Sequence, residues 1–455
     1  MESIQGVKES DSILKSTELP LGTIQTLPPE VIANIFSCLS GVDLFQARGV
    51  CHSWKLLAST DFLWRRRIPW IAGNILQTLN PHVKKQLLLE DAFEKKSFEV
   101  KTFSGGLSQP LTPTNFFIHG SNLFADYGDS SYICIDIAND KAKQRLDFFN
   151  CRVQFLIANE QWLLWHALSG KERDTSIWSR FALRFFRHHF QEYVSAEVRD
   201  IPYPVKRVEL LGNFAFFETE VANQDERGSK KLVIVKNLTS FSAHHIPADA
   251  WCLTSSPVSQ LFYYQKDSSA IYSFTIDNPI AMTKIVMMKD KNHPLFDLKL
   301  TKTSLVGCSE KEVYLWDRAS KELQRKIEVS FCIKALAIDG RLVILYSVDE
   351  GVHVFSLETG LCLSSFHVEG ISKQANSQKE IVWHHLFYKN PEGFLSVYHL
   401  ITGRKVLDQE DWGNPFLKIQ VIDNTLYGLH ADGIKAYTFV PFRRKKASQL
   451  ISAEK

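Results

Sequence analysis

The hydrophobic pattern of the chain changes its period once, near residue 98. Before that point, apolar residues recur at helical spacing in short groups. After it, apolar and polar residues alternate in short β-rich runs that Asp, Asn, Gly, Ser and Lys separate. A period near 3.6 residues is typical of amphipathic helices, and a period of two is typical of half-buried strands. The pattern therefore predicts a small helical domain followed by a large all-β domain.

The first predicted helix follows the pair Pro28-Pro29, which can occupy a helix start because the missing N–H groups have no intrahelical partner there. Glu30 then places negative charge in the first turn, where the helix dipole favours it. Ser40-Gly41 is predicted to end the helix. Its apolar residues form one broad stripe: Val31, Ile32, Ile35, Phe36 and Leu39.

Two further short helical pieces are predicted before residue 65. One is centred on Leu44. The other carries its apolar residues along one side, namely Val50, Cys51, Trp54, Leu57 and Ala58. The apolar pair Leu63-Trp64 ends the region. A domain this small buries little surface on its own, so we expect another chain or flanking helices to cover part of its apolar face.

The region from Leu27 to Trp64 resembles the F-box family in the identity and spacing of its anchor residues. The matching groups are Leu27-Pro28-Pro29-Glu30, Ile35-Phe36-Ser37-Cys38-Leu39, Asp43-Leu44, Val50-Cys51-His52-Ser53-Trp54 and Leu63-Trp64. The resemblance implies binding to a Skp-type adaptor and, through it, to a cullin-based ubiquitin ligase. It implies adaptor contact, or direct support of that contact, for Leu27, Pro28, Glu30, Ile35, Phe36, Leu39, Leu44, Val50, Cys51, Trp54, Leu63 and Trp64. The pattern does not divide contact residues from support residues.

The β-rich part repeats one strand pattern with a polar residue near its end. Successive copies lie 39 to 54 residues apart, which resembles WD-repeat β-propellers, although only Trp316-Asp317 is a Trp-Asp pair. Eight copies favour eight blades, with seven if the weak second copy is an insertion; a β-sandwich or two smaller β domains is the alternative. The repeat positions are Asp136, Ala182, Lys236, Thr275, Asp317, Ser356, His399 and Thr438.

The last unit, Lys418–Phe439, is one strand short of a blade. Phe98–Phe103 can supply that strand and close the ring, which removes an exposed sheet edge. The predicted organisation is α+β and multidomain: a disordered tail at 1–23, the F-box at 24–67, a helical connector at 68–97, the propeller at 98–441 and a basic tail at 442–455.

Composition and short motifs argue against catalysis and against nucleic-acid binding as the main function. The net charge is only +3, with 53 basic and 50 acidic residues, and the eight cysteines show no metal-type spacing. Nucleotide, zinc-protease and esterase motifs are not found. The doublets His188-His189, His244-His245 and His384-His385 are poor metal sites because neighbours on a strand point to opposite faces. We therefore expect no catalytic residue, no metal and no cofactor.

Arg180–His189 mixes basic and aromatic residues, which fits either a surface for acidic or phosphorylated segments or an ordinary strand with one wet face. The N-terminus shows no secretory pattern, and no uninterrupted apolar window spans a membrane. We expect a cytoplasmic protein, with the nucleus possible, or the host cytosol for a bacterial effector. The expected function is a substrate receptor whose propeller binds a target protein. The alternative is a scaffold, effector or adaptor-sequestering protein that uses the same F-box without delivering a target.

Overall fold

The structure is a computed structural model. It describes residues 27–39, 44, 47–48, 50–59, 63, 92–93, 96, 98–103, 113–127, 131–147, 152–158, 162–168, 179–185, 195–201, 205–222, 229–238, 240, 242–254, 259–276, 278–287, 294–371 and 378–439. The chain divides into two compact units, Met1–Asp91 and Ala92–Lys455. This division falls inside the predicted connector, residues 68–97. Both predicted tails and most of that connector lie outside the described residues.

The helical unit begins with α1 (Pro29–Cys38), which starts and ends close to the predicted positions. Pro28 is its N-cap and Glu30 lies in the first turn, while the amides of Val31 and Ile32 donate to the Pro28 carbonyl at 3.0 and 3.1 Å. The helix α3 (His52–Leu57) is short, and Cys51 is its N-cap. The core of this unit consists of Ile32, Phe36, Leu44, Ala47, Ala58 and Leu63.

The second unit contains eight four-stranded antiparallel sheets in the part of the chain that is described. Sheet 1 consists of β2 (Asn115–His119), β3 (Asn122–Asp126), β4 (Ser131–Asp136) and β5 (Lys141–Asp147). Sheet 2 consists of β6 (Arg152–Ala158), β7 (Trp162–Leu168), β8 (Ser179–Phe185) and β9 (Ser195–Ile201). Sheet 3 consists of β10 (Val205–Leu211), β11 (Phe214–Ala222), β12 (Ser229–Asn237) and β13 (Ala243–Pro247). Sheet 4 consists of β14 (Ala250–Thr254), β15 (Gln260–Gln265), β16 (Ala270–Thr275) and β17 (Asn278–Met287).

The remaining sheets follow the same order. Sheet 5 consists of β18 (Asp297–Leu300), β19 (Ser304–Cys308), β20 (Glu312–Asp317) and β21 (Leu323–Glu328). Sheet 6 consists of β22 (Ile333–Asp339), β23 (Leu342–Ser347), β24 (Gly351–Ser356) and β25 (Cys362–His367). Sheet 7 consists of β26 (Gln378–Val382), β27 (His385–Lys389), β28 (Leu395–His399) and β29 (Lys405–Leu407), which the 3-10 turn η2 (Gln409–Asp411) follows. Sheet 8 consists of β30 (Lys418–Ile422), β31 (Thr425–His430), β32 (Gly433–Phe439) and β1 (Phe98–Phe103).

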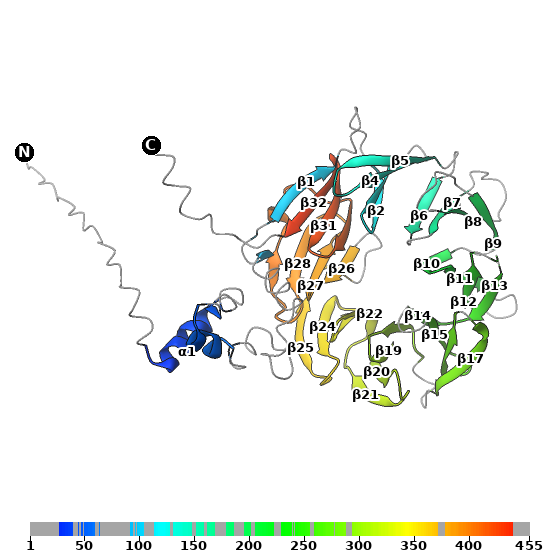
Figure 1. Cartoon of the computed structure of the whole chain (residues 1–455). Coiled ribbons are helices and arrows are strands. Elements are labelled where there is room, and N and C mark those ends of the chain that lie inside the picture. Colours follow the sequence, from blue (N-terminus) through cyan, green and yellow to red (C-terminus); the bar gives the residue numbers. More distant parts are fainter. Residues whose placement is uncertain are drawn as a thin grey trace, which may run out of the picture. The chain divides into compact units, whose positions relative to one another are not determined.

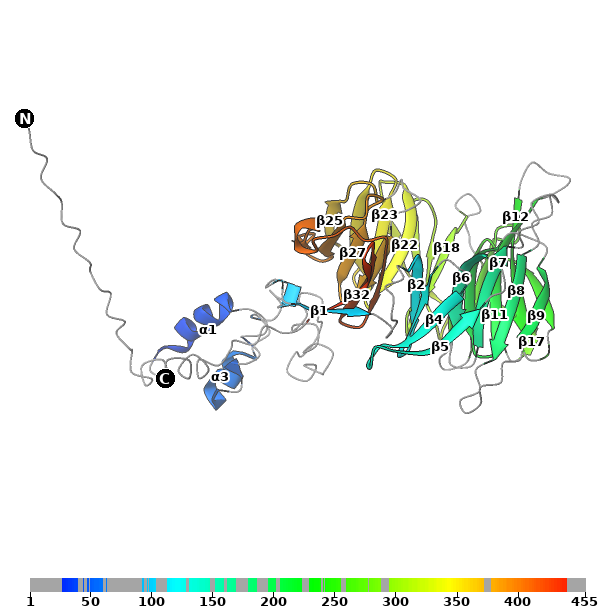
Figure 2. The same cartoon turned by 90° about the horizontal axis from the view of Figure 1, so that it is seen from above.

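The sheets form a ring, with the first strand of each sheet innermost (Figure 1). The inner strands β14 and β18, β18 and β22, and β26 and β30 contact one another, and β2 contacts both β30 and β6. Figure 2 shows the same sheets from a direction turned by 90°. This is a β-propeller, as predicted, and not a sandwich or a pair of smaller β domains. The weak second copy forms a sheet of its own, and the preference for eight blades stays a prediction.

The ring closes by pairing a strand from its N-terminal end with the last strand of the chain. β1 lies antiparallel to β32, with Phe98 opposite Phe439 and Phe103 opposite Ile434. Phe103 is buried in a core that includes Tyr427 and Ile434. The prediction that Phe98–Phe103 completes the final unit is therefore confirmed.

Every predicted repeat position lies on the third strand of a sheet, and its polar side chain often caps the following turn. The Asp317 carboxylate accepts hydrogen bonds from the amides of Ala319 and Ser320 at 2.9 and 2.7 Å. Asp136 does the same for Ala138 and Asn139 in sheet 1. Side chains that accept backbone N–H groups two and three residues ahead stabilise such turns. The recurring polar residue is therefore explained by the turn that joins the third and fourth strands.

The same turn requires a left-handed backbone conformation four residues after the repeat position. Gly360 and Gly403 take it with φ of +73° and +66°, while Lys321 takes it with φ of +66°. A Cβ atom on Gly403 would lie 3.0 Å from Cδ1 of Phe366. Glycine adopts positive φ without a steric penalty, whereas other residues are strained there.

We expect Gly403→Ala to lower the free energy of unfolding by about 1–2 kcal/mol, because it adds both backbone strain and a close contact with Phe366. Lys321→Gly relieves strain at the equivalent turn and is expected not to lower stability. Urea denaturation of the full-length variants measures both. Equal losses from the two substitutions would contradict this account of the turn.

Candidate functional site

The helical unit exposes large apolar residues on both of its described helical segments. On α1, Ile32 and Phe36 are 6% and 1% exposed, whereas Val31 and Ile35 are 41% and 45% exposed. The predicted single stripe is thus two stripes: one packs in the core and the other faces outward. Pro28 is also exposed and lies three positions before Val31. We call Pro28, Val31 and Ile35 the α1 apolar face, since residues three and four apart are neighbours on a helix.

The α3 segment adds exposed apolar residues of its own. Val50 is 62% exposed and Leu56 is 58% exposed. Val50 was expected on the apolar side of the third helix, but it precedes that helix and its amide donates to the Ala47 carbonyl. The helix is too short to place Val50 on its packed side, so this expectation is wrong.

The structure divides the twelve predicted adaptor residues by burial. Pro28, Glu30, Ile35 and Val50 are exposed, while Leu27, Leu39, Cys51 and Trp54 are half-buried. Three residues, Phe36, Leu44 and Leu63, are core residues, and Phe36 packs edge-on against Trp54 with ring centroids 5.1 Å apart. Trp64 lies outside the described residues. Val31 and Leu56 are exposed apolar residues that the prediction missed, and the four-residue spacing of Val31 and Ile35 is the signal that points to the first.

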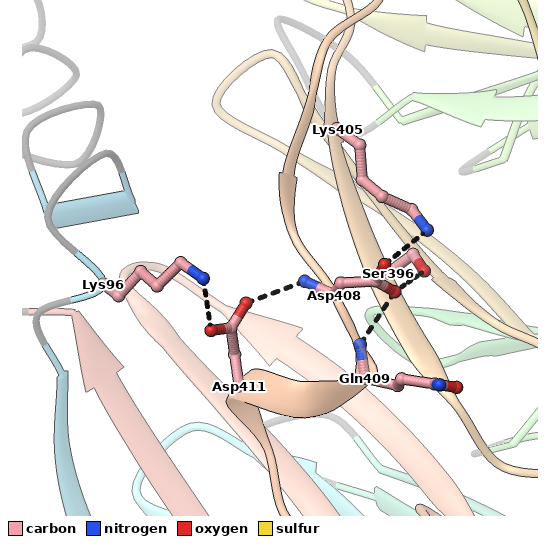
Figure 3. A network of polar contacts seen from close by, with 6 residues as sticks. All are labelled: Lys96, Ser396, Lys405, Asp408, Gln409 and Asp411. Carbon is pink, nitrogen blue, oxygen red and sulfur yellow. Dashed lines mark hydrogen bonds and ion pairs between the residues drawn. The ribbon is translucent and has the colours of Figure 1, made fainter.

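The start of the second unit is anchored in the ring beside β1. Phe93 is 3% exposed, and the centroid of its ring lies 4.2 Å from the centroid of the His385 ring and 4.3 Å from that of the Phe439 ring. Three residues later, the Lys96 ammonium lies 2.6 Å from the Asp411 carboxylate (Figure 3). The segment that leads into β1 is therefore held by an apolar contact and by an ion pair.

The carboxylate that holds Lys96 is itself fixed by a polar network around η2 (Figure 3). Asp411 also accepts a hydrogen bond from the Asp408 amide at 2.9 Å. The Asp408 carboxylate in turn accepts from the Gln409 amide at 2.8 Å, from Lys405 at 2.9 Å and from the Ser396 hydroxyl at 3.2 Å. Partial burial acts to raise the pKa of Asp408, but the hydrogen bonds from Lys405 and Gln409 outweigh it and lower the pKa. The network presents Asp411 to Lys96 in one orientation.

In the doublet His384-His385, His384 lies in the turn before β27 and His385 is the first residue of β27, and the two rings have different partners. His384 Nδ1 lies 2.9 Å from the Asp339 carboxylate, whereas His385 is buried and its Nδ1 pairs with the Trp383 carbonyl at 2.8 Å. Burial holds the pKa of His385 well below its usual value, so this ring is neutral. Among the described residues, no group of His, Cys, Asp and Glu has the geometry of a metal site. His188-His189 and the end of Arg180–His189 lie outside them.

Two half-buried residues of opposite charge, Glu380 and Lys418, lie on the neighbouring inner strands β26 and β30. Lys418 donates to the Asn115 side chain at 2.7 Å and to the Phe116 carbonyl at 2.6 Å, so it joins sheet 8 to sheet 1. Burial raises the pKa of Glu380 to about 7 and lowers the pKa of Lys418 to about 8, and each charge partly offsets the effect on the other. Glu380 therefore changes its charge near neutral pH.

We expect the free energy of unfolding of Glu380→Gln, relative to wild type, to rise as the pH increases from about 4.5 to about 7. In that range the folded protein retains the Glu380 proton and the unfolded chain releases it, so wild type loses stability as the pH rises. Glutamine does not titrate and removes this loss. Urea denaturation of both proteins at several pH values measures the difference, and a pH-independent difference would contradict the assignment.

Comparisons with known proteins identify the helical unit and leave the ring without a curated relative. The model of the F-box-like family matches residues 24–68, so the chain contains an F-box-like domain. A search of curated protein sequences finds no match. Within the described residues, no helix has the length and apolar character needed to cross a membrane.

Solved structures resemble the ring at low sequence identity. The designed protein Ika8 is 13% identical, with 74% of this chain and 98% of that chain covered and a TM-score of 0.49. Sqt1 of Saccharomyces cerevisiae is 9% identical, with 76% and 98% covered and a TM-score of 0.49. BamB of Moraxella catarrhalis is 12% identical, with 75% and 98% covered and a TM-score of 0.49. The fold of the ring is established by its own sheets.

Proposed function

We propose that this chain is the substrate receptor of a cullin-based ubiquitin ligase. The F-box-like domain binds a Skp-type adaptor, and the propeller binds the protein to be modified. The observation that carries the proposal is the α1 apolar face, where Val31 and Ile35 stay 41% and 45% exposed on a domain whose core is already filled by Phe36 and its neighbours. An exposed apolar face of this kind marks a protein-binding surface.

The architecture of the second unit supports a binding role for it. A propeller is a rigid scaffold that presents loops to partners, while the receptor itself needs no catalytic residue. Holding a target beside the ubiquitin-transfer machinery raises its effective concentration there. We also class the ring with the WD-repeat propellers, because its recurring polar residue caps the turn after the third strand, as Asp317 does.

Adaptor binding is tested with the purified full-length chain and a Skp-type adaptor. Co-elution as a stoichiometric complex on size-exclusion chromatography is the expected result. The complex should then recruit a cullin with its RING subunit. Separate elution of chain and adaptor at micromolar concentrations would overturn the proposal.

The delivery of a target is tested in cells by deleting residues 24–67 and comparing the proteins bound to the ring. A receptor is expected to bind at least one protein that accumulates after this deletion and that the complete complex ubiquitinates in vitro. If adaptor binding is intact and no bound protein changes in abundance or modification, the chain is instead a scaffold or an adaptor-sequestering protein.

A further inference from the structure

A cavity of about 510 Å³ lies where sheet 3 meets sheet 4. One side of it is β13, and the other side is formed by residues from β15, β16 and β17. This volume falls in the range of pockets that hold specific ligands. The cavity is unrelated to the F-box-like domain and to the anchored segment around Phe93.

The cavity runs along the edge of β13. Residues 244–247 all line it, although consecutive residues of a strand point to opposite faces of a sheet. Four consecutive lining residues therefore indicate a cavity that follows the strand edge and is not limited to one face. β13 is the last strand of its sheet, and no described strand pairs with its outer side. Such an edge offers backbone N–H and C=O groups to an added strand.

The side that belongs to sheet 4 is aromatic. Tyr263 and Tyr272 are stacked with ring centroids 5.4 Å apart, and Phe274 lies beside them in the lining. Tyr263 and Phe274 are 2% and 1% exposed and belong to the core, so they support Tyr272 from behind, while Tyr272 is half-buried and reaches the surface. An aromatic surface of this kind favours an apolar or aromatic side chain of a ligand.

The described residues that line the cavity include basic side chains. These are the ammonium group of Lys284 and the imidazoles of His244 and His245, and all three residues are exposed. No described lining residue is acidic. Complementary charge selects partners and rejects those of the same sign, so the rim favours carboxylates.

We propose that this cavity binds an extended acidic peptide segment of a partner protein. The segment adds to β13 as a further antiparallel or parallel strand, with backbone hydrogen bonds along the edge of residues 243–246. Pro247 ends this edge, because it has no N–H and its carbonyl already accepts a hydrogen bond from the Gln265 side chain at 3.1 Å. One apolar side chain lies against the Tyr272 ring, and carboxylates flank it near Lys284 and the two histidines. The inference rests on the proposed function in one respect: the segment belongs to the protein that the receptor delivers.

The test uses fluorescent ten-residue peptides that alternate apolar residues with either glutamate or lysine, and the full-length protein. The glutamate peptide is expected to bind, and the lysine peptide is not expected to bind. A glutamate peptide with two apolar residues changed to proline is expected to bind at least tenfold more weakly, because proline has no N–H to donate to a strand edge. Equal binding of the glutamate and lysine peptides, or no binding of the glutamate peptide, would overturn the proposal.

Three variants locate the binding and separate it from the adaptor interaction. Lys284→Glu and Tyr272→Ala are each expected to lower the affinity for the glutamate peptide at least tenfold. Lys266→Glu is the matched control, because Lys266 is exposed on the β15–β16 turn and does not line the cavity. Thermal melts verify that each variant is folded. Ile35→Asp is expected to retain peptide binding, so failure of the peptide test and failure of adaptor binding are distinguishable. Unchanged binding in folded Lys284→Glu and Tyr272→Ala would place the peptide elsewhere and refute the site.

Discussion

Replacing Ile35 with aspartate is expected to weaken adaptor binding by at least a hundredfold while the helical unit stays folded. Ile35 is 45% exposed on the α1 apolar face, so its side chain contributes little to the core. In a complex, however, the new carboxylate would lose its hydration against an apolar partner surface. The few residues that dominate an interface each contribute about 2 kcal/mol or more, and about 2.7 kcal/mol corresponds to a hundredfold change. Titration calorimetry with a purified Skp-type adaptor measures the effect.

Two other substitutions on the same helix distinguish loss of contact from loss of folding. Phe36→Ala removes a side chain that is 1% exposed and packs against Trp54, and it is expected to cost about 3–5 kcal/mol and to unfold the helical unit. Asn34→Asp adds the same charge as Ile35→Asp at an exposed polar position and is expected to change affinity less than threefold. If Asn34→Asp is as damaging as Ile35→Asp, general charge repulsion explains the loss and the α1 apolar face does not.

The strand pattern predicts most of the ring because each strand carries its own signal. The repeat positions from Asp136 to Thr438 all lie on third strands, since alternation, turn chemistry and a polar capping residue recur locally. Closure by Phe98–Phe103 is predictable for a different reason. A count of strands leaves the final unit one short, and the β-rich segment Phe98–Phe103 has the right length to complete it.

Burial within α1 is not predictable in the same way. Val31, Ile32, Ile35 and Phe36 are all apolar, so the sequence shows one wide stripe, and only the position of the other helices decides that Ile32 and Phe36 turn inward. The error at Val50 has a related cause. Helical spacing continues from Val50 to Ala58, but the backbone enters the helix only at His52.

The cavity beside β13 cannot be predicted from the sequence, because its lining residues come from two different sheets. His244 and His245 both line this cavity. Their nearness to Tyr272 and Lys284 depends on how sheet 3 packs against sheet 4, and these residues are some 30 to 40 positions apart in the chain. A pattern within one strand carries no information about the face of the next sheet.

The double substitution Val100→Pro/Lys101→Pro is expected to open the ring, with a loss of at least about 3 kcal/mol. Adjacent residues of a strand direct their N–H groups to opposite sides, so either Val100 or Lys101 has its N–H facing β32. Changing both residues to proline therefore removes that donor in either case. The pairing of Val100 with Tyr437 and of Lys101 with Ala436 would break in the middle of β1. The exposed edge of β32 would then promote aggregation. Thermal denaturation and limited proteolysis of the full-length protein measure the loss.

The matched control is Val100→Ala/Lys101→Ala, which keeps both backbone N–H groups. Val100 is 53% exposed and Lys101 is exposed, so their side chains add little to the core, although Lys101 donates to the Ile137 carbonyl at 2.7 Å. The alanine protein is therefore expected to lose less than about 1 kcal/mol. Because β1 joins sheet 8 directly after the anchored residues Phe93 and Lys96, proteolysis in the proline protein should begin in this region and not in the interior strands. If the proline and alanine proteins melt at the same temperature, the pairing of β1 with β32 does not hold the ring closed.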